Sequence, residues 1–116
     1  MEHTFTTVDG IEIKDGAIAF RDALAKKNPE LVFKPMLSEA RTNGRNCNYF
    51  DVSEADDPTF RLGSIGQFHD GEFWYNYLQM ENGRWHYETQ FYTRRSKHMA
   101  VALKEAFKQI KSPSFN

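Results

Sequence analysis

The chain has 116 residues, a net charge of −1 at pH 7 and 27% charged residues. Its mean hydropathy is −0.70, and no apolar run approaches the roughly 18 residues that a membrane-spanning helix needs. These values exclude a protein that spans the membrane with helices. The length suits a single domain, residues 1–116, with a core of its own.

The N-terminus and the single cysteine both predict a protein of the cytoplasm. Residues 1–4 lack the basic and apolar regions of a signal peptide. Cys47 is the only cysteine, so it forms neither an intrachain disulfide nor a cysteine zinc cluster. Because no charge partner for a thiolate is evident in the sequence, we expect the Cys47 thiol to be inert.

The first elements along the chain are predicted to be a hairpin and a helix. Residues 4–8 and 11–14 flank the dipeptide Asp9-Gly10, which suits a two-residue hairpin turn because glycine tolerates positive φ. The helical spacing of apolar residues then predicts a helix over 17–27, with Asp15 as its N-cap.

Short strands are predicted for the middle of the chain. Residues 31–33 are β-prone but stand before Pro35, so this strand is expected to be bent or to lie at a sheet edge. Further strands are predicted over 49–52 and 61–68. The acid-rich segment 53–58 between them is predicted to be a solvated turn.

The last third of the chain predicts a β-meander followed by a helix. Strands over 72–78 and 84–92 are separated by a turn at 81–83, and Ser96 is predicted to cap a helix over 97–111. The whole order of elements predicts an α+β domain. We expect an antiparallel sheet of about four to five strands, with two helices packed on one of its faces.

Aromatic residues are concentrated in residues 60–92, which contain ten of them. Successive side chains of a strand lie on opposite faces of the sheet. Both faces of the strand over 72–78 are therefore apolar or aromatic, with Phe73, Tyr75 and Tyr77 on one and Trp74 and Leu78 on the other. One face can pack on the helices, so the other must meet solvent, a second subunit or a ligand.

The two halves of the chain differ in charge. Residues 1–60 carry 7 Lys or Arg against 11 Asp or Glu, whereas residues 61–116 carry 8 against 5. A basic half attracts anionic partners through its local field even when the whole chain is nearly neutral. A solvated helix face is the alternative explanation for the lysines near the end of the chain.

Catalytic motifs are absent from the sequence, so we expect no catalytic residues, no cofactor and no metal. There is no glycine-rich nucleotide loop, no zinc-binding His-Glu-x-x-His and no nucleophile elbow. The most enzyme-like set is Arg84, His86 and Glu88, which alternation places on one strand face. A small hydrolase that uses His86 and Glu88 is the third and weakest of three functional hypotheses.

Binding of single-stranded nucleic acid is the first hypothesis. Single strands are held by rings on which any base can stack and by cations that follow the phosphates. No base-reading motif is present, so little sequence specificity is expected, and the choice between DNA and RNA stays open. The predicted phosphate contacts are Arg84, Arg94, Arg95 and Lys97, and the predicted stacking rings are Trp74, Trp85 and Tyr92.

The end of the chain resembles proteins of a known biological setting. Residues 91–97, FYTRRSK, followed by residues 102–106, ALKEA, are similar to the strand-to-helix ending of small accessory proteins made early by tailed bacteriophages. These include single-stranded DNA-binding transcription regulators of N4-like phages and inhibitors of host enzymes. The resemblance covers about the last third of the chain and implies the host cytoplasm, with host RNA polymerase or another host protein as a candidate partner.

The spare aromatic face also predicts association with other proteins. A sheet with two apolar faces needs cover, and a second copy of the chain in a homodimer would provide it. The second functional hypothesis is a protein-interaction module that inhibits or recruits a host enzyme. In that case the aromatic and arginine-rich surface would be an interface hot spot.

Overall fold

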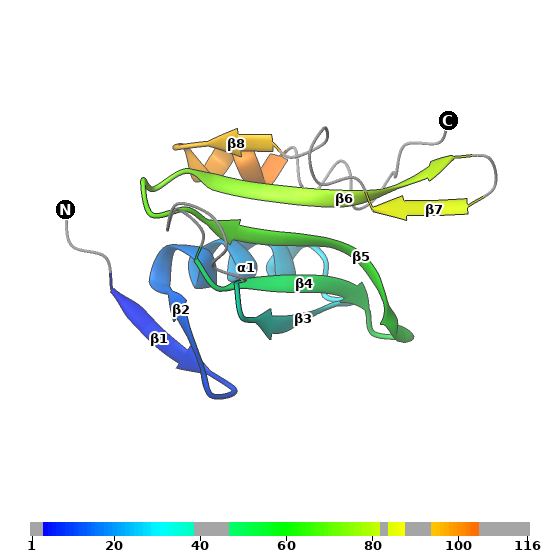
Figure 1. Cartoon of the computed structure of the whole chain (residues 1–116), viewed down its shortest axis with the longest axis horizontal. Helices are drawn as coiled ribbons and strands as arrows, with labels where there is room; N and C mark the ends of the chain where they lie inside the picture. Colours follow the sequence, from blue (N-terminus) through cyan, green and yellow to red (C-terminus); the bar gives the residue numbers. More distant parts are fainter. Residues whose placement is uncertain (1–3, 39–46, 82–83, 88–93, 105–116) are drawn as a thin grey trace.

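The computed structural model describes residues 4–38, 47–81, 84–87 and 94–104, and it describes side chains in 4–38, 47–59, 61–75 and 97–104. Two antiparallel sheets and two helices make up this part of the chain (Figure 1). The predicted α+β class is confirmed.

The larger sheet, called the main sheet below, has the strand order β3-β4-β5-β6-β7 within the described residues, and β8 also pairs with β6. β7 pairs with the end of β6, at residues 78–81, and β8 pairs with its beginning, at residues 73–75. Figure 1 shows β7 and β8 at opposite ends of β6. The strands are β3 (Leu31–Met36), β4 (Tyr49–Glu54), β5 (Asp57–Gln67), β6 (Phe73–Glu81), β7 (Arg84–Tyr87) and β8 (Arg94–Ser96).

The N-terminal hairpin forms as predicted. β1 (Phe5–Val8) and β2 (Ile11–Lys14) pair in a sheet of their own, which projects from the rest of the fold in Figure 1. Asp9 and Gly10 have φ values of 49° and 81°. Positive φ at both central residues is the requirement of the hairpin turn whose twist matches that of the strands.

Helix α1 (Asp15–Lys27) follows β2 directly, and the prediction that Asp15 caps it is wrong. Lys14 occupies the cap position and Asp15 is the first helical residue. The hairpin places the hydroxyls of Thr4 and Thr6 beside the Asp15 carboxylate, and both donate hydrogen bonds to it. The carboxylate is therefore held by the hairpin and not by the first turn of the helix.

The segment between β4 and β5 is also more regular than predicted. β4 continues to Glu54 and β5 begins at Asp57, so only two residues turn the chain. The ladder changes register on both sides of Ser53, and the Ser53 hydroxyl bonds to the Pro58 carbonyl at 3.2 Å. A β-bulge of this kind accommodates residues of one strand that have no partner on the other, so the two strands stay paired into the acid-rich segment.

The edge strand β3 agrees with its prediction in position but is longer. It continues through Pro35 to Met36 and is the first strand of the main sheet. An edge strand tolerates proline because the missing N–H can face away from the neighbouring strand. Along β3, the N–H of Leu31 points to the same side as the nitrogen of Pro35, away from β4. It donates a hydrogen bond to the Asn28 carbonyl at 3.0 Å.

The prediction that Ser96 caps the last helix is wrong. Ser96 is the final residue of β8 and pairs with Phe73. The second helix, called the C-terminal helix below, begins at Met99, and the His98 carbonyl accepts hydrogen bonds from the N–H groups of Val101 and Ala102. The predicted helical residues 105–111 lie outside the described residues, as do the turn at 82–83 and the predicted strand end at 88–92.

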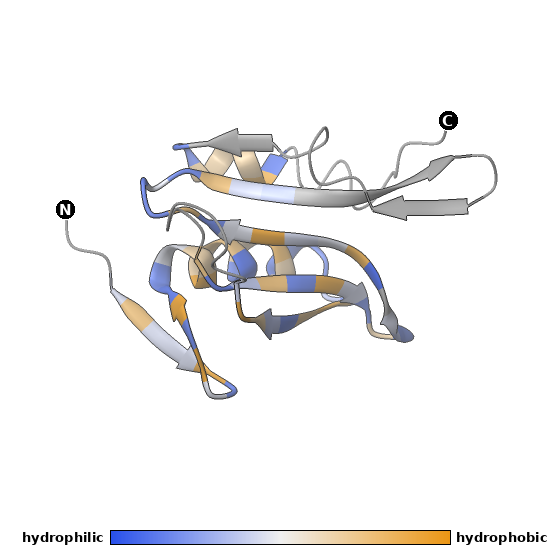
Figure 2. Cartoon of the chain, in the orientation of Figure 1, coloured by the Kyte–Doolittle hydropathy of each residue, from blue (hydrophilic) through white to orange (hydrophobic). Residues whose placement is uncertain are grey.

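Both helices pack on one face of the main sheet, as predicted. Phe20 of α1 meets Phe73 of β6 edge to face, with ring centroids 5.5 Å apart. Met99 and Leu103 of the C-terminal helix pack against the same cluster. Hydrophobic and hydrophilic residues alternate along β4 in Figure 2, as expected of a strand with one covered face. The core comprises Ile13, Ala17, Phe20, Leu24, Leu31, Phe50, Val52, Ile65, Phe73, Tyr75 and Ala102.

Candidate nucleic-acid interface

The face of the main sheet opposite the helices, called the open face, carries a group of rings. Trp74 alternates with Phe73 and Tyr75 of the core, so it lies on the open face. Its ring centroid is 5.6 Å from that of Tyr49 on β4 and 5.8 Å from that of Phe68, which follows β5. We call Tyr49, Phe68 and Trp74 the aromatic row.

Trp74 was predicted to be a stacking ring, but it is enclosed by its own chain and only 8% exposed. Its indole lies against Gly66, where an added Cβ would come within 2.6 Å of a ring carbon. Phe68 stacks on it at an interplanar angle of 28°. Within the described residues the indole N–H has no hydrogen-bond partner.

The ring surface that remains accessible belongs to Tyr49 and Phe68, which are both half-buried. Sequence reasoning missed these two residues because it weighted the ring-rich segment that begins with β6. The alternation of Tyr49 with the apolar Phe50 and Val52 was the signal that could have placed Tyr49 on the open face.

A second row on the open face is polar. Lys34, Asp51 and Ser64 are register partners across β3, β4 and β5. The Ser64 hydroxyl donates to the Asp51 carboxylate at 2.9 Å, and the Arg61 guanidinium lies 3.6 Å from the same oxygen. Lys34 is exposed. We call Lys34, Asp51, Ser64 and Arg61 the polar row, which carries two cations and one carboxylate.

β8 brings two predicted phosphate contacts to the edge of the main sheet. Arg95 is the register partner of Trp74, and Arg94 is that of Tyr75. Because Trp74 and Tyr75 belong to opposite faces, the two arginine positions belong to opposite faces as well. The sequence placed both arginines at a junction between strand and helix and did not predict β8.

The chain stays basic beyond β8, with no acidic residue before position 105. Residues 94–104 contain four Lys or Arg and no Asp or Glu. Lys97, His98 and Lys104 are exposed. We call Arg94, Arg95, Lys97, His98 and Lys104 the basic corner.

The remaining predicted contacts lie elsewhere or outside the described residues. Arg84 and Trp85 belong to β7, where their register partners are Glu81 and Met80. Met80 is six residues along β6 from Trp74, which corresponds to about 20 Å. The structure therefore does not bring Arg84 and Trp85 next to β8. Tyr92 and Glu88 lie outside the described residues, and His86 is the register partner of Gln79.

Cys47 has a charged neighbour that the sequence did not reveal. The thiol is 7% exposed, and burial raises its pKa, while the nearby Lys14 ammonium acts in the opposite direction and Asp70 adds to the rise. Lys14 is itself 2% exposed and donates to the Phe68 carbonyl at 2.7 Å. Burial lowers the Lys14 pKa, against the effects of Cys47 and Asp70. A thiol with a raised pKa fits the expected inert role.

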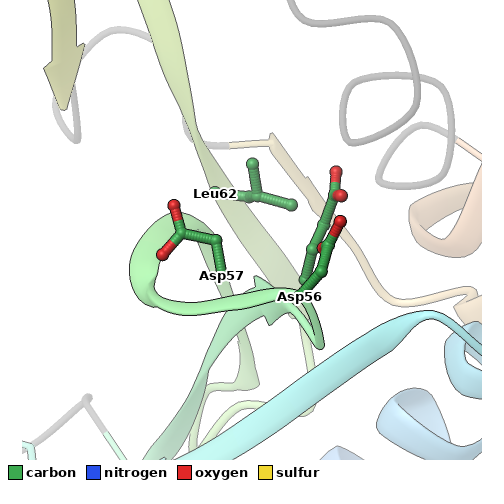
Figure 3. Close-up of a pocket in the computed structure, with 4 residues that line it drawn as sticks. Asp56, Asp57 and Leu62 are labelled. Atoms are coloured by element: carbon green, nitrogen blue, oxygen red, sulfur yellow. The ribbon is translucent and has the colours of Figure 1, made fainter.

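The turn between β4 and β5 forms an acidic end of the molecule. Glu54, Asp56, Asp57 and Leu62 line a hollow of about 240 Å³. In Figure 3, Leu62 lies between the side chains of Asp56 and Asp57, which point away from each other. Asp56 and Asp57 are exposed. Among the described residues, no group of three or more His, Cys, Asp or Glu side chains could hold a metal ion.

Comparisons with known proteins add no relative from which function could be transferred. No protein-family model, no curated protein and no solved structure matches the chain. No helix in the described ranges is long and apolar enough to cross a membrane.

Proposed function

We propose that this protein is a non-enzymatic single-stranded nucleic-acid-binding protein with little sequence specificity, and that DNA is its first candidate ligand. The observation that supports this proposal most is the register of β8. It pairs Arg95 with Trp74 at one end of the aromatic row, and the exposed cations of the basic corner follow immediately. Rings beside a run of cations are what a single strand requires.

The physical basis of the affinity would be electrostatic. Each phosphate that a lysine or arginine neutralises releases condensed counterions, so the logarithm of the binding constant falls with the logarithm of salt concentration. For single strands the slope changes by about 0.7 for each phosphate contact. The basic corner offers Lys97 and Lys104 as exposed contacts in addition to Arg95, whose position lies on the open face with Trp74, whereas the position of Arg94 belongs to the other face.

The proposed setting is the regulation of phage transcription in the host cytoplasm, with host RNA polymerase as a candidate partner. The phage resemblance of the last third of the chain supports this setting. We also propose a homodimer that leaves the open face free, since exposed apolar side chains occur outside that face, such as Leu37 after β3, which is 66% exposed, and Phe5 of the N-terminal hairpin, which is 43% exposed. A second copy would cover such side chains.

Salt titration of matched variants tests the proposed function. We expect Lys97→Ala with Lys104→Ala to weaken single-stranded DNA binding and to reduce the salt slope by up to about 1.4, which is two contacts. The control is Lys26→Ala with Lys27→Ala, which removes two exposed lysines from α1. Fluorescence anisotropy measures both slopes. Equal slopes for the two double variants would remove the basic corner from the site.

The second candidate function is a protein-interaction module that inhibits or recruits a host enzyme. The observation that favours it is the acidic end, where exposed Asp56 and Asp57 could imitate nucleic-acid phosphates toward a cationic partner. A pull-down from bacterial lysate treated with nuclease tests this function. One stoichiometric protein that is captured by the natural chain and lost with Asp56→Asn and Asp57→Asn would support it.

A further inference from the structure

We infer that the bound single strand extends from the basic corner across the open face to β3, with Tyr49 as a stacking platform and Lys34 as a distal phosphate contact. This inference rests on the proposed function, and it assigns Tyr49 and Lys34 to the same site.

The register of the main sheet defines the path. Arg95 pairs with Trp74, and Trp74 pairs with Gly66 on β5. The contact between the Trp74 and Tyr49 rings then leads to β4, where Tyr49 pairs with Met36 on β3. Five strands at a spacing of about 4.8 Å make this crossing about 19 Å wide. The rings therefore occupy the middle of this crossing, with Arg95 on the strand at one edge and Met36 on the strand at the other.

Tyr49 is prepared for stacking. Its ring rests on Trp74 at an interplanar angle of 56°, and Trp74 is in turn held between Gly66 and Phe68. The Tyr49 side chain remains half-buried, so part of its surface is accessible. A ring that is already fixed loses little conformational freedom when a base stacks on it.

The polar row supplies charge beside this line of rings. Lys34 and Met36 are alternate residues of β3, and so are Asp51 and Tyr49 on β4, so the two rows lie about 7 Å apart. The Asp51 carboxylate is engaged by the Ser64 hydroxyl and lies close to Arg61, so its field at Lys34 is partly offset. A strand whose bases lie on the rings would place its phosphates beside Lys34.

Other routes from the basic corner are less suitable. The opposite face is covered by α1 and the C-terminal helix, which enclose the core. A route along β5 would lead toward Asp57, ten residues from Gln67 and about 33 Å away, where the acidic end would repel phosphates. A nucleic-acid strand that crosses the sheet toward β3 stays away from that acidic end.

Substitutions at Tyr49 and Lys34 test this path with labelled oligonucleotides of about 16 nucleotides. We expect Tyr49→Leu to weaken binding roughly 5- to 150-fold, the range expected for one stacked base, and Tyr49→Phe to restore it relative to Tyr49→Leu. Lys34→Gln should reduce the salt slope by about 0.7. The control is Lys26→Gln on α1, which should bind like the natural chain.

The outcomes separate this inference from the proposed function. If basic-corner variants weaken binding but Tyr49→Leu and Lys34→Gln do not, the path is wrong and the proposed function stands. If the natural chain binds no single strand at low salt, both are wrong. Photocrosslinking of the natural chain to a bromouracil-containing strand does not depend on how any variant folds. A crosslink at Tyr49 supports the path, and crosslinks confined to residues 94–104 overturn it.

Discussion

The two faces of the main sheet differ in what their side chains contact. On the covered face, the side chains between the helices and the sheet are fully buried, as in Phe20, Phe50, Ile65 and Tyr75. On the open face, half-buried Tyr49 stands beside the exposed cation Lys34. The described side chains of the covered face pack against one another, whereas the open face combines rings with charges, which a core does not need. We therefore expect a ligand to bind on the open face.

The largest expected effect belongs to the covered face. Phe20→Ala should lower the free energy of unfolding by about 3–5 kcal/mol, because it leaves a cavity beside Phe73 in the core. Urea unfolding followed by circular dichroism measures the change. The matched control Val101→Ala changes a side chain that is 53% exposed and should stay within about 0.5 kcal/mol. Equal losses for the two variants would contradict the assignment of the covered face as the core.

Substitution of two glycines, one on the open face and one in α1 on the covered side, tests how closely each side is packed. At Gly66 on the open face an added methyl group would meet the Trp74 ring, which Phe68 and Tyr49 hold in place, so Gly66→Ala should cost about 1–3 kcal/mol. At Gly16 of α1 it would meet the end of the Gln67 side chain, whose amide donates to the Gly71 carbonyl at 3.1 Å, and the gain in helix propensity opposes the cost of moving that amide. Gly16→Ala should therefore change stability by less than about 1 kcal/mol.

Urea unfolding measures both glycine variants, and tryptophan fluorescence reports the combined environments of Trp74 and Trp85. A Gly66→Ala protein with natural stability and an unchanged emission spectrum would mean that the rings of the open face are not closely packed.

The smallest expected effect concerns the N-terminal hairpin, which lies outside both faces. Hydrogen bonds from Thr4 and Thr6 lower the pKa of Asp15 below its ordinary value of 3.8. A lowered pKa in the folded state means that the ionised carboxylate stabilises the fold above about pH 3.8, and that this contribution is lost as the pH falls through the folded-state pKa. Asp15→Asn should remove this part of the acid dependence.

Thermal unfolding between about pH 2 and 6 measures that dependence. Thr4→Val with Thr6→Val should reproduce the effect of Asp15→Asn, because these hydroxyls are the donors. A natural chain and an Asp15→Asn protein that lose stability in parallel on acidification would show that the contacts between the hairpin and Asp15 contribute nothing.

Local patterns in the sequence were sufficient to predict much of the fold. Asp9-Gly10 predicts the hairpin because the turn requires positive φ at those positions. Pro35 predicts an edge strand because it lacks a ladder donor. Helical spacing and alternation together predict the α+β class with both helices on one face.

Features that depend on long-range pairing could not be predicted in this way. β8 contains Arg94, Arg95 and Ser96, which have no strand pattern, and it forms because β6 offers a free edge. The burial of Trp74 depends on Gly66 across the ladder and on Tyr49 from another strand. The number of rings therefore led to the prediction of a binding surface but could not show which rings stay accessible.

The most direct test of the central claim is fluorescence anisotropy of labelled single-stranded DNA and of the matching duplex, titrated with the natural chain at two salt concentrations. We expect tighter binding to the single strand than to the duplex, because only unpaired bases can stack on the rings. We also expect this binding to weaken as salt increases. No binding to the single strand at low salt, or equal binding to both forms, would contradict the proposed function.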